Sequence, residues 1–142
     1  MNHFGSKLRF RLVKDTNQDT SFIYVVIPDV ILKFLIQYQS ELNIYLDKIT
    51  QFEPEELRYL YTEEVEELRS MASEVLESLE NIYESRIFQE FRDKHHLSEI
   101  NFSQEEVNEV FNHLIHICNV VLNGQKILFV SSMVDDSAMI EG

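Results

Sequence analysis

Glutamates spaced three, four and seven positions apart are the residues whose pattern best suggests chemistry in this chain. Within residues 62–96 they fall on one face of an expected helix, because each helical turn takes 3.6 residues. A row of carboxylates on a rigid helix could occupy a basic groove built for the phosphates of nucleic acid. With nearby aromatic anchors, the candidate partner-binding residues are Glu63, Glu66, Glu67, Glu74, Glu77, Glu84, Tyr59, Tyr61 and Tyr83.

The acidic charge is concentrated in one part of the sequence. The formal charge is −13, from 25 acidic and 12 basic residues. Residues 53–106 hold 16 acids and 5 bases, a net −11, whereas the first 14 residues hold four bases and no acid. Such a field repels nucleic acid and anionic membranes and attracts basic surfaces. We therefore expect a basic protein partner, with no direct binding to nucleic acid or membrane.

A solvated helix face is the alternative explanation for a run of charge. Like charges three or four residues apart, such as Glu63 and Glu67, each cost a few tenths of a kcal/mol. A helix selected for stability alone would interleave more lysines, and between Glu63 and Glu90 the basic residues are Arg69 and Arg86. This imbalance favours partner binding over simple solubility.

A second carboxylate pattern suggests metal chemistry. Glu64-x-x-Glu67, a 22-residue gap and Glu90-x-x-Asp93 resemble the signature of the MazG-like nucleotide pyrophosphatases. In that all-helical family four carboxylates from two helices hold magnesium over a nucleoside triphosphate. The resemblance covers 30 residues and implies a magnesium-dependent pyrophosphatase. On one continuous helix, however, the two pairs would lie 26 residues or about 39 Å apart, so this is our third hypothesis.

Other potential catalytic groups have simpler structural interpretations. Glu109, His113 and His116 share a helix face with metal-ligand spacing, yet no fourth ligand is evident. Cys118 falls on the buried face of the same helix, where a thiol is a small core residue. The sequence has no nucleophile elbow and no phosphate-binding glycine loop. We therefore expect no enzyme activity, catalytic residue, metal or cofactor.

The elements that would position the acidic face follow from hydrophobic periodicity. Alternation over 7–12 and an apolar β-branched run over 22–27 predict an N-terminal hairpin, and residues 126–131 predict a third strand. Helices are expected from Asp29 to about Ile49, from Pro54 to Thr62, over 62–96 as one long acidic helix, and from Ser103. The last begins with a capping box, Ser103 with Glu106, and a hydrophobic staple, Phe102 with Val107.

Together these elements predict an α+β fold. A small, mostly antiparallel three-stranded sheet, formed by the N-terminal hairpin and the C-terminal strand, should pack against three to four helices. Residues 1–134 are expected to form a single domain, and residues 135–142 a flexible acidic tail. A lone cysteine, no signal sequence and no long apolar run predict a cytoplasmic protein.

The leading functional hypothesis is a non-catalytic acidic inhibitor that neutralises a nucleic-acid-processing enzyme by mimicking nucleic acid. Immunity proteins and phage anti-defence proteins share this physical profile, which is an analogy of charge and shape. The alternative is a structural or adaptor protein that homodimerises through residues 62–96. It would bury Leu68, Val75 and Leu79 between two chains.

Overall fold

A four-stranded antiparallel sheet joins the two ends of the chain. The computed structural model describes residues 6–13, 24–50, 57–80, 86–98, 100–124 and 127–134. Its strands are β1 (Ser6–Val13), β2 (Tyr24–Pro28), β3 (Leu57–Leu60) and β4 (Ile127–Val134). They pair in the order β2-β1-β4-β3, each neighbour antiparallel. The N-terminal and C-terminal strands are therefore the two central strands.

The prediction of a three-stranded sheet is wrong, because the structure has a fourth strand. The sequence predicts a helix from Pro54 to Thr62, with proline at its first position, and Leu57–Leu60 falls inside this range. In the structure this segment is β3, and it pairs with β4 through Tyr59 opposite Phe129 and Leu60 opposite Leu128. The neighbouring strand supplies backbone hydrogen bonds, and this tertiary pairing overrides a weak local helical pattern. Pro54 and the rest of residues 51–56 lie outside the described part of the chain.

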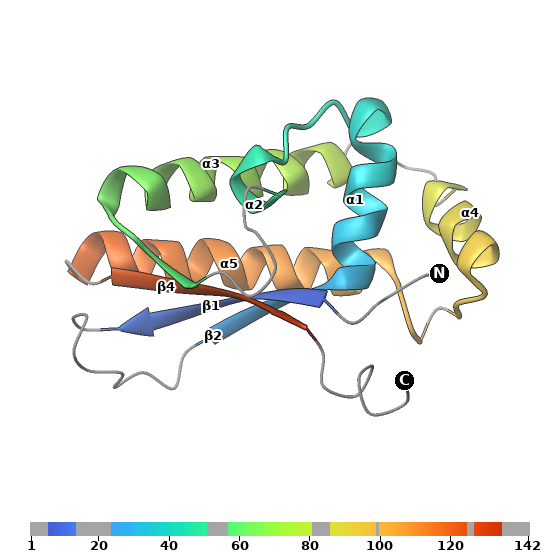
Figure 1. Ribbon diagram of the computed structural model, residues 1–142. Coiled ribbons are helices and arrows are strands. Elements are labelled where there is room, and N and C mark those ends of the chain that lie inside the picture. The colour runs from blue at the N-terminus through green and yellow to red at the C-terminus, as the bar shows by residue number, and fades with distance from the viewer. Residues whose placement is uncertain are drawn as a thin grey trace.

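The described helices cover one face of the sheet, which confirms an α+β fold with a layer of helices (Figure 1). They are α1 (Asp29–Leu42), α2 (Asp47–Thr50), α3 (Thr62–Glu80), α4 (Arg86–His95) and α5 (Gln104–Gly124). α1 and α5 contact the strands, and α3 packs along α5 on the side away from the sheet. The buried side chains of the described residues form one hydrophobic cluster that includes both sheet and helices. The predicted tail, residues 135–142, lies outside the described residues.

The helix expected from Asp29 to Ile49 ends earlier. α1 stops at Leu42, and Asn43 follows in the left-handed region with φ 55° and ψ 51°. Asparagine tolerates this conformation because its short polar side chain reduces the usual penalty. The N–H of Ile44 then donates to the carbonyl of Gln39 at 3.1 Å, which closes the helix end. The chain turns here and forms the short helix α2.

The acidic helix keeps its expected buried stripe but not its expected length. Val65, Leu68, Ala72, Val75 and Leu79 are all buried, together with Met71. α3 ends at Glu80, and the next described helix, α4, runs in a different direction (Figure 1). One continuous helix over 62–96 is therefore wrong. The apolar face continues into α4 with a shift in phase, and that shift was the signal of two separate helices.

Aromatic rings hold α4 against α1. The ring of Phe34 on α1 lies 4.5 Å from that of Phe88 and 5.4 Å from that of Phe91, measured between centroids. Phe102, just before α5, lies 4.9 Å from Phe34 and completes the cluster. Rings at these separations attract one another beyond their burial of apolar area. α4 is thus fixed to the core although the segment before it, residues 81–85, is not described.

The start of α5 confirms much of the expected cap. The backbone N–H of Glu106 donates to Ser103 Oγ at 3.3 Å, as a capping box requires. Phe102 and Val107, the two residues of the predicted staple, are fully buried. Local sequence signals were sufficient here because both partners of each contact lie within five residues.

Candidate partner-binding face

The outer side of α3 presents a row of carboxylates. Because Val65, Leu68 and Val75 face the core, the opposite side of this amphipathic helix faces solvent. Five of the predicted partner-binding residues are exposed there, and we call them the α3 face: Glu63, Glu66, Glu67, Glu74 and Glu77. The sixth predicted glutamate, Glu84, lies outside the described residues.

The charge on α3 is not arranged for helix stability. The helix has seven glutamates and one arginine, a net −6. That arginine, Arg69, donates from Nη1 to Asn119 Oδ1 on α5 at 2.8 Å, so it is directed toward the neighbouring helix. Glu77 and Glu80 lie in the last turn, where a helix favours cations, and no basic residue is present there. The acidic row therefore costs the isolated helix some stability.

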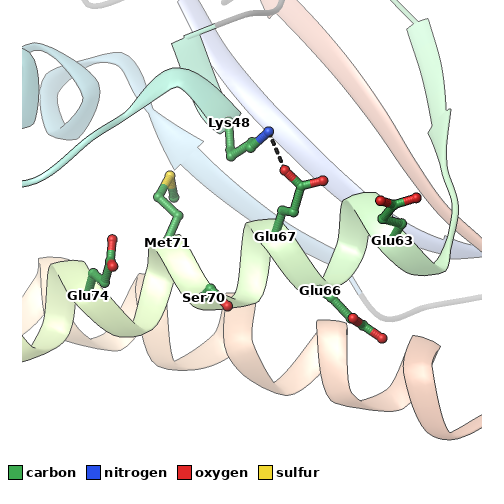
Figure 2. A pocket seen from close by; sticks show the side chains of 7 residues that line it. All are labelled: Lys48, Glu63, Glu66, Glu67, Ser70, Met71 and Glu74. Carbon is green, nitrogen blue, oxygen red and sulfur yellow. Dashed lines mark ion pairs between the residues drawn. The ribbon is translucent and has the colours of Figure 1, made fainter.

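An open groove of about 430 Å³ runs along the α3 face beneath α2. Figure 2 shows Lys48 of α2 directed toward α3, with Glu67, Glu63 and Glu74 along the same helix. Lys48 Nζ lies 2.5 Å from a carboxylate oxygen of Glu67. Hydrogen bonding to Glu67 raises the pKa of Lys48 above its ordinary value. Among the lining residues, Lys48 is the one cation in a groove otherwise bordered by carboxylates, Ser70 and Met71.

A second hollow, of about 290 Å³, continues the acidic surface toward the loop after α1. It is lined by Glu74, Glu77 and Ser78 from α3 and by Asn43 and Tyr45 from the loop. Tyr45 is 79% exposed. An exposed aromatic ring beside two carboxylates can bind an arginine or lysine, through the ring face and through charge together. The left-handed Asn43 turns the chain so that Tyr45 reaches this position.

Of the three tyrosines predicted as anchors beside the glutamates, the structure describes two, and only one of them is exposed. Tyr61 is 54% exposed and precedes α3, whereas Tyr59 is half-buried and lies on β3. Tyr83 lies outside the described residues. Sequence reasoning missed Tyr45, because it was counted among the apolar residues of a helix reaching Ile49. Asn43 between Leu42 and Ile44 was the signal that could have revealed the turn.

No family model, curated protein or solved structure matches this chain.

The four carboxylates of the pyrophosphatase-like pattern lie on two helices, with Glu64 and Glu67 on α3 and Glu90 and Asp93 on α4. The 39 Å separation that was inferred from one continuous helix is therefore no longer an argument. Within the described residues, however, no three His, Cys, Asp or Glu side chains are grouped so that they could hold a metal ion. This holds for these four carboxylates and equally for Glu109, His113 and His116 on α5, all of which are described.

Cys118 is fully buried on α5. Burial raises its pKa to about 12, and Arg69 opposes the shift only in part. A nucleophilic cysteine needs the thiolate at neutral pH, so this side chain serves as core packing. The interpretation from sequence agrees with this position.

The residues expected at a dimer seam are buried within one chain. Leu68 is 1% exposed, and Val75 and Leu79 are fully buried, where α3 packs on α5. These side chains are not available to a second copy unless α3 leaves its own core.

Among the described helices, none combines the length and the apolar composition that crossing a membrane requires.

Proposed function

We propose that this protein is a non-catalytic acidic inhibitor whose α3 face docks on a basic surface of a partner protein. The observation that carries the proposal is the one-sided charge of α3: five exposed carboxylates on its outer side, and its one arginine turned toward α5. A folded helix presents these groups without a backbone ordering cost on binding, so that only the side chains lose freedom. Their electrostatic field would raise the association rate and set the salt dependence.

The partner class follows from the spacing and sign of the charges. The carboxylates recur at about one per 5.4 Å turn, and a nucleic-acid strand also presents regularly spaced anions. A groove lined with lysine and arginine to hold phosphates would accept such a row. We infer that the partner is a nucleic-acid-processing enzyme, of the kind that immunity or anti-defence proteins neutralise, and that the α3 face mimics nucleic acid.

Affinity would come from an aromatic anchor rather than from the exposed charges. Interfaces owe most of their binding energy to a few well-packed side chains, with tyrosine and arginine enriched among them. Tyr45 lines the second hollow together with Glu74 and Glu77. An arginine of the partner inserted between this ring and the carboxylates would give both affinity and orientation.

A pulldown from host lysate with three matched baits tests the proposal. The α3 variant carries Glu66→Gln, Glu74→Gln and Glu77→Gln. The control variant carries Asp93→Asn, Glu105→Gln and Glu109→Gln, three exposed acids on α4 and α5. Each variant moves the formal charge from −13 to −10, so total charge is matched and only its position differs.

The expected result is one basic protein held at about 50 mM salt by the wild type and the control, released at about 500 mM, and lost with the α3 variant. Adding the wild-type protein to that partner should then inhibit its action on nucleic acid at a one-to-one ratio. Equal capture by the two variants would show that the α3 face has no special part in binding. Capture without inhibition would reject the inhibitor function.

A further inference from the structure

The open groove and the second hollow join along α3. Glu74 lines both of them, and we call the two together the α2–α3 groove. Its lining residues on α3 run from Glu63 to Ser78, which is about 22 Å at 1.5 Å per residue. Lys48 of α2 and Tyr45 of the loop before it line the other side (Figure 2). A partner therefore reaches the carboxylates in this groove with a protruding segment rather than with a flat surface.

The structure shows a cation inside this groove. Lys48 comes from α2, and its ammonium group lies 2.5 Å from a carboxylate oxygen of Glu67 on α3. Met71 lies one turn further along α3 and lines the groove, where it gives the aliphatic part of a basic side chain an apolar contact. Lys48 and Glu67 both stay partly exposed, and ion pairs of that kind stabilise a fold little. Another cation can therefore take the place of Lys48.

The second hollow has the groups to bind a further cation. Tyr45 is 79% exposed and lines this hollow together with Glu74 and Glu77. Among the described residues that line it, none is basic. A guanidinium can stack on the tyrosine ring and pair with the carboxylates. Along α3 these two glutamates lie seven and ten residues beyond Glu67, or about 10–15 Å.

We propose that the partner inserts a basic chain segment into the α2–α3 groove. One cation of the segment replaces Lys48 at Glu67, and a second cation, an arginine, binds in the second hollow at Tyr45. The inference rests on the proposed function and names the part of the partner that binds. Basic arms that hold nucleic acid have this chemistry, so an arm that occupies the groove is kept from phosphates.

The distance between the two positions predicts the spacing of the cations. In an extended chain, residues four positions apart lie on the same side, about 13 Å from each other. Arginines at this spacing therefore reach Glu67 and Tyr45 at once, whereas adjacent arginines point to opposite sides and reach one position. Binding at both positions by one segment is tighter than binding at either alone, because the second contact is intramolecular.

Two short glycine–serine peptides with two arginines each test this spacing. The spaced peptide has its arginines four positions apart, and the adjacent peptide has them next to each other, so the total charge is the same. Nuclear magnetic resonance titration of the isotope-labelled protein at about 50 mM salt, where screening is weak, measures both dissociation constants. The spaced peptide should bind about fivefold more tightly. Its largest chemical-shift changes should fall on residues 43–48 and 67–78.

Matched charge variants locate the two positions. Glu67→Gln with Glu74→Gln, the groove variant, should weaken binding of the spaced peptide about fivefold. Glu80→Gln with Glu109→Gln is the control, because both residues are exposed and line neither hollow. It should change the affinity by less than about twofold. Each variant moves the formal charge from −13 to −11, so only the position of the charge differs.

Replacement of the lysine tests the exchange of cations. Lys48→Gln removes the competing ammonium group and should tighten binding of the spaced peptide about threefold. Lys94→Gln makes the same change of charge at an exposed position that lines neither hollow, and it should tighten binding by less than about 1.5-fold. Thermal unfolding of each variant establishes that it is folded.

Two results would overturn the proposal. Equal affinity of the two peptides would show that the two positions do not act together. Equal binding by the groove variant and its control would assign the attraction to the net charge alone. Capture of the partner from lysate tests the proposed function separately. If the α3 variant loses the partner while both peptides bind alike, the docking function stands and the inserted segment is wrong. If the spaced peptide binds in the groove but the lysate yields no basic protein, the inhibitor function is wrong and the groove remains a site for basic segments.

Discussion

The ammonium group of Lys48 on α2 lies 2.5 Å from the carboxylate of Glu67 on α3 and places a cation at the centre of the acidic groove. The pair ties the short helix α2 to α3. It also shields the middle of the carboxylate row from an incoming basic partner. Lys48 therefore has opposite effects on folding and on the proposed binding, and the two effects can be measured separately.

Replacing Lys48 with glutamine should destabilise the fold slightly and strengthen partner capture. Both side chains are partly exposed, 34% for Lys48 and 45% for Glu67, and exposed ion pairs contribute only a small part of the free energy of unfolding. Urea unfolding should show a loss of this size that shrinks at about 1 M salt. Lys94→Gln, at an exposed position of α4, is the control for charge. A loss as large as that of a buried core substitution would mean that the pair also organises the core.

Tyr45→Ala should weaken partner binding and leave stability unchanged. The side chain is 79% exposed, so its removal opens no cavity, and unfolding should shift by less than about 0.5 kcal/mol. As an interface anchor, however, its loss should weaken the complex at least fivefold, or about 1 kcal/mol. Titration calorimetry with the captured partner measures the effect. Should Tyr61→Ala weaken binding while Tyr45→Ala does not, the anchor lies at the start of α3, as the sequence alone predicted.

The difference between these two tyrosines shows what the sequence could predict. The buried stripe of α3 and the cap of α5 were predictable, because their contacts join residues three to five positions apart. Tyr45 was not, because its exposure depends on the turn at Asn43. Similarly, β3 depends on pairing with β4, which lies far along the chain. The acidic row was visible in the sequence, but its division between α3 and α4 depends on how the aromatic cluster packs.

Phe34→Ala should cost about 3–5 kcal/mol of stability. The ring is fully buried and lies within 5.5 Å, centroid to centroid, of Tyr38, Phe88, Phe91 and Phe102. Its loss leaves a cavity where α1, α4 and the start of α5 meet. Denaturant unfolding gives the free energy, and Ile100→Ala, at a position that is 91% exposed, should change it by less than about 0.5 kcal/mol. A similar small change for Phe34→Ala would show that α4 is not held by this cluster.

His95 should make the protein less stable in mild acid. Burial lowers the pKa of this imidazole below its ordinary value of 6.5, and the nearby charges of Lys94, Lys33 and His96 lower it further. The unfolded chain therefore binds a proton more readily than the folded protein does. The stability that the neutral imidazole of His95 contributes is fully present above about pH 6.5. It is lost as the pH falls through the pKa of His95 in the folded protein. Its ring also lies 4.3 Å from that of Phe91, so the neutral form belongs to the aromatic cluster.

Urea unfolding at several values between about pH 5.5 and pH 7.5 measures this dependence around the ordinary histidine pKa. The wild-type protein should gain stability with rising pH across this window, and His95→Gln should remove most of that gain. His96→Asn is the control, because His96 is exposed and has a positive φ of 57°, a conformation that asparagine tolerates. If His95→Gln keeps the full pH dependence of the wild type, burial of His95 has no part in acid sensitivity.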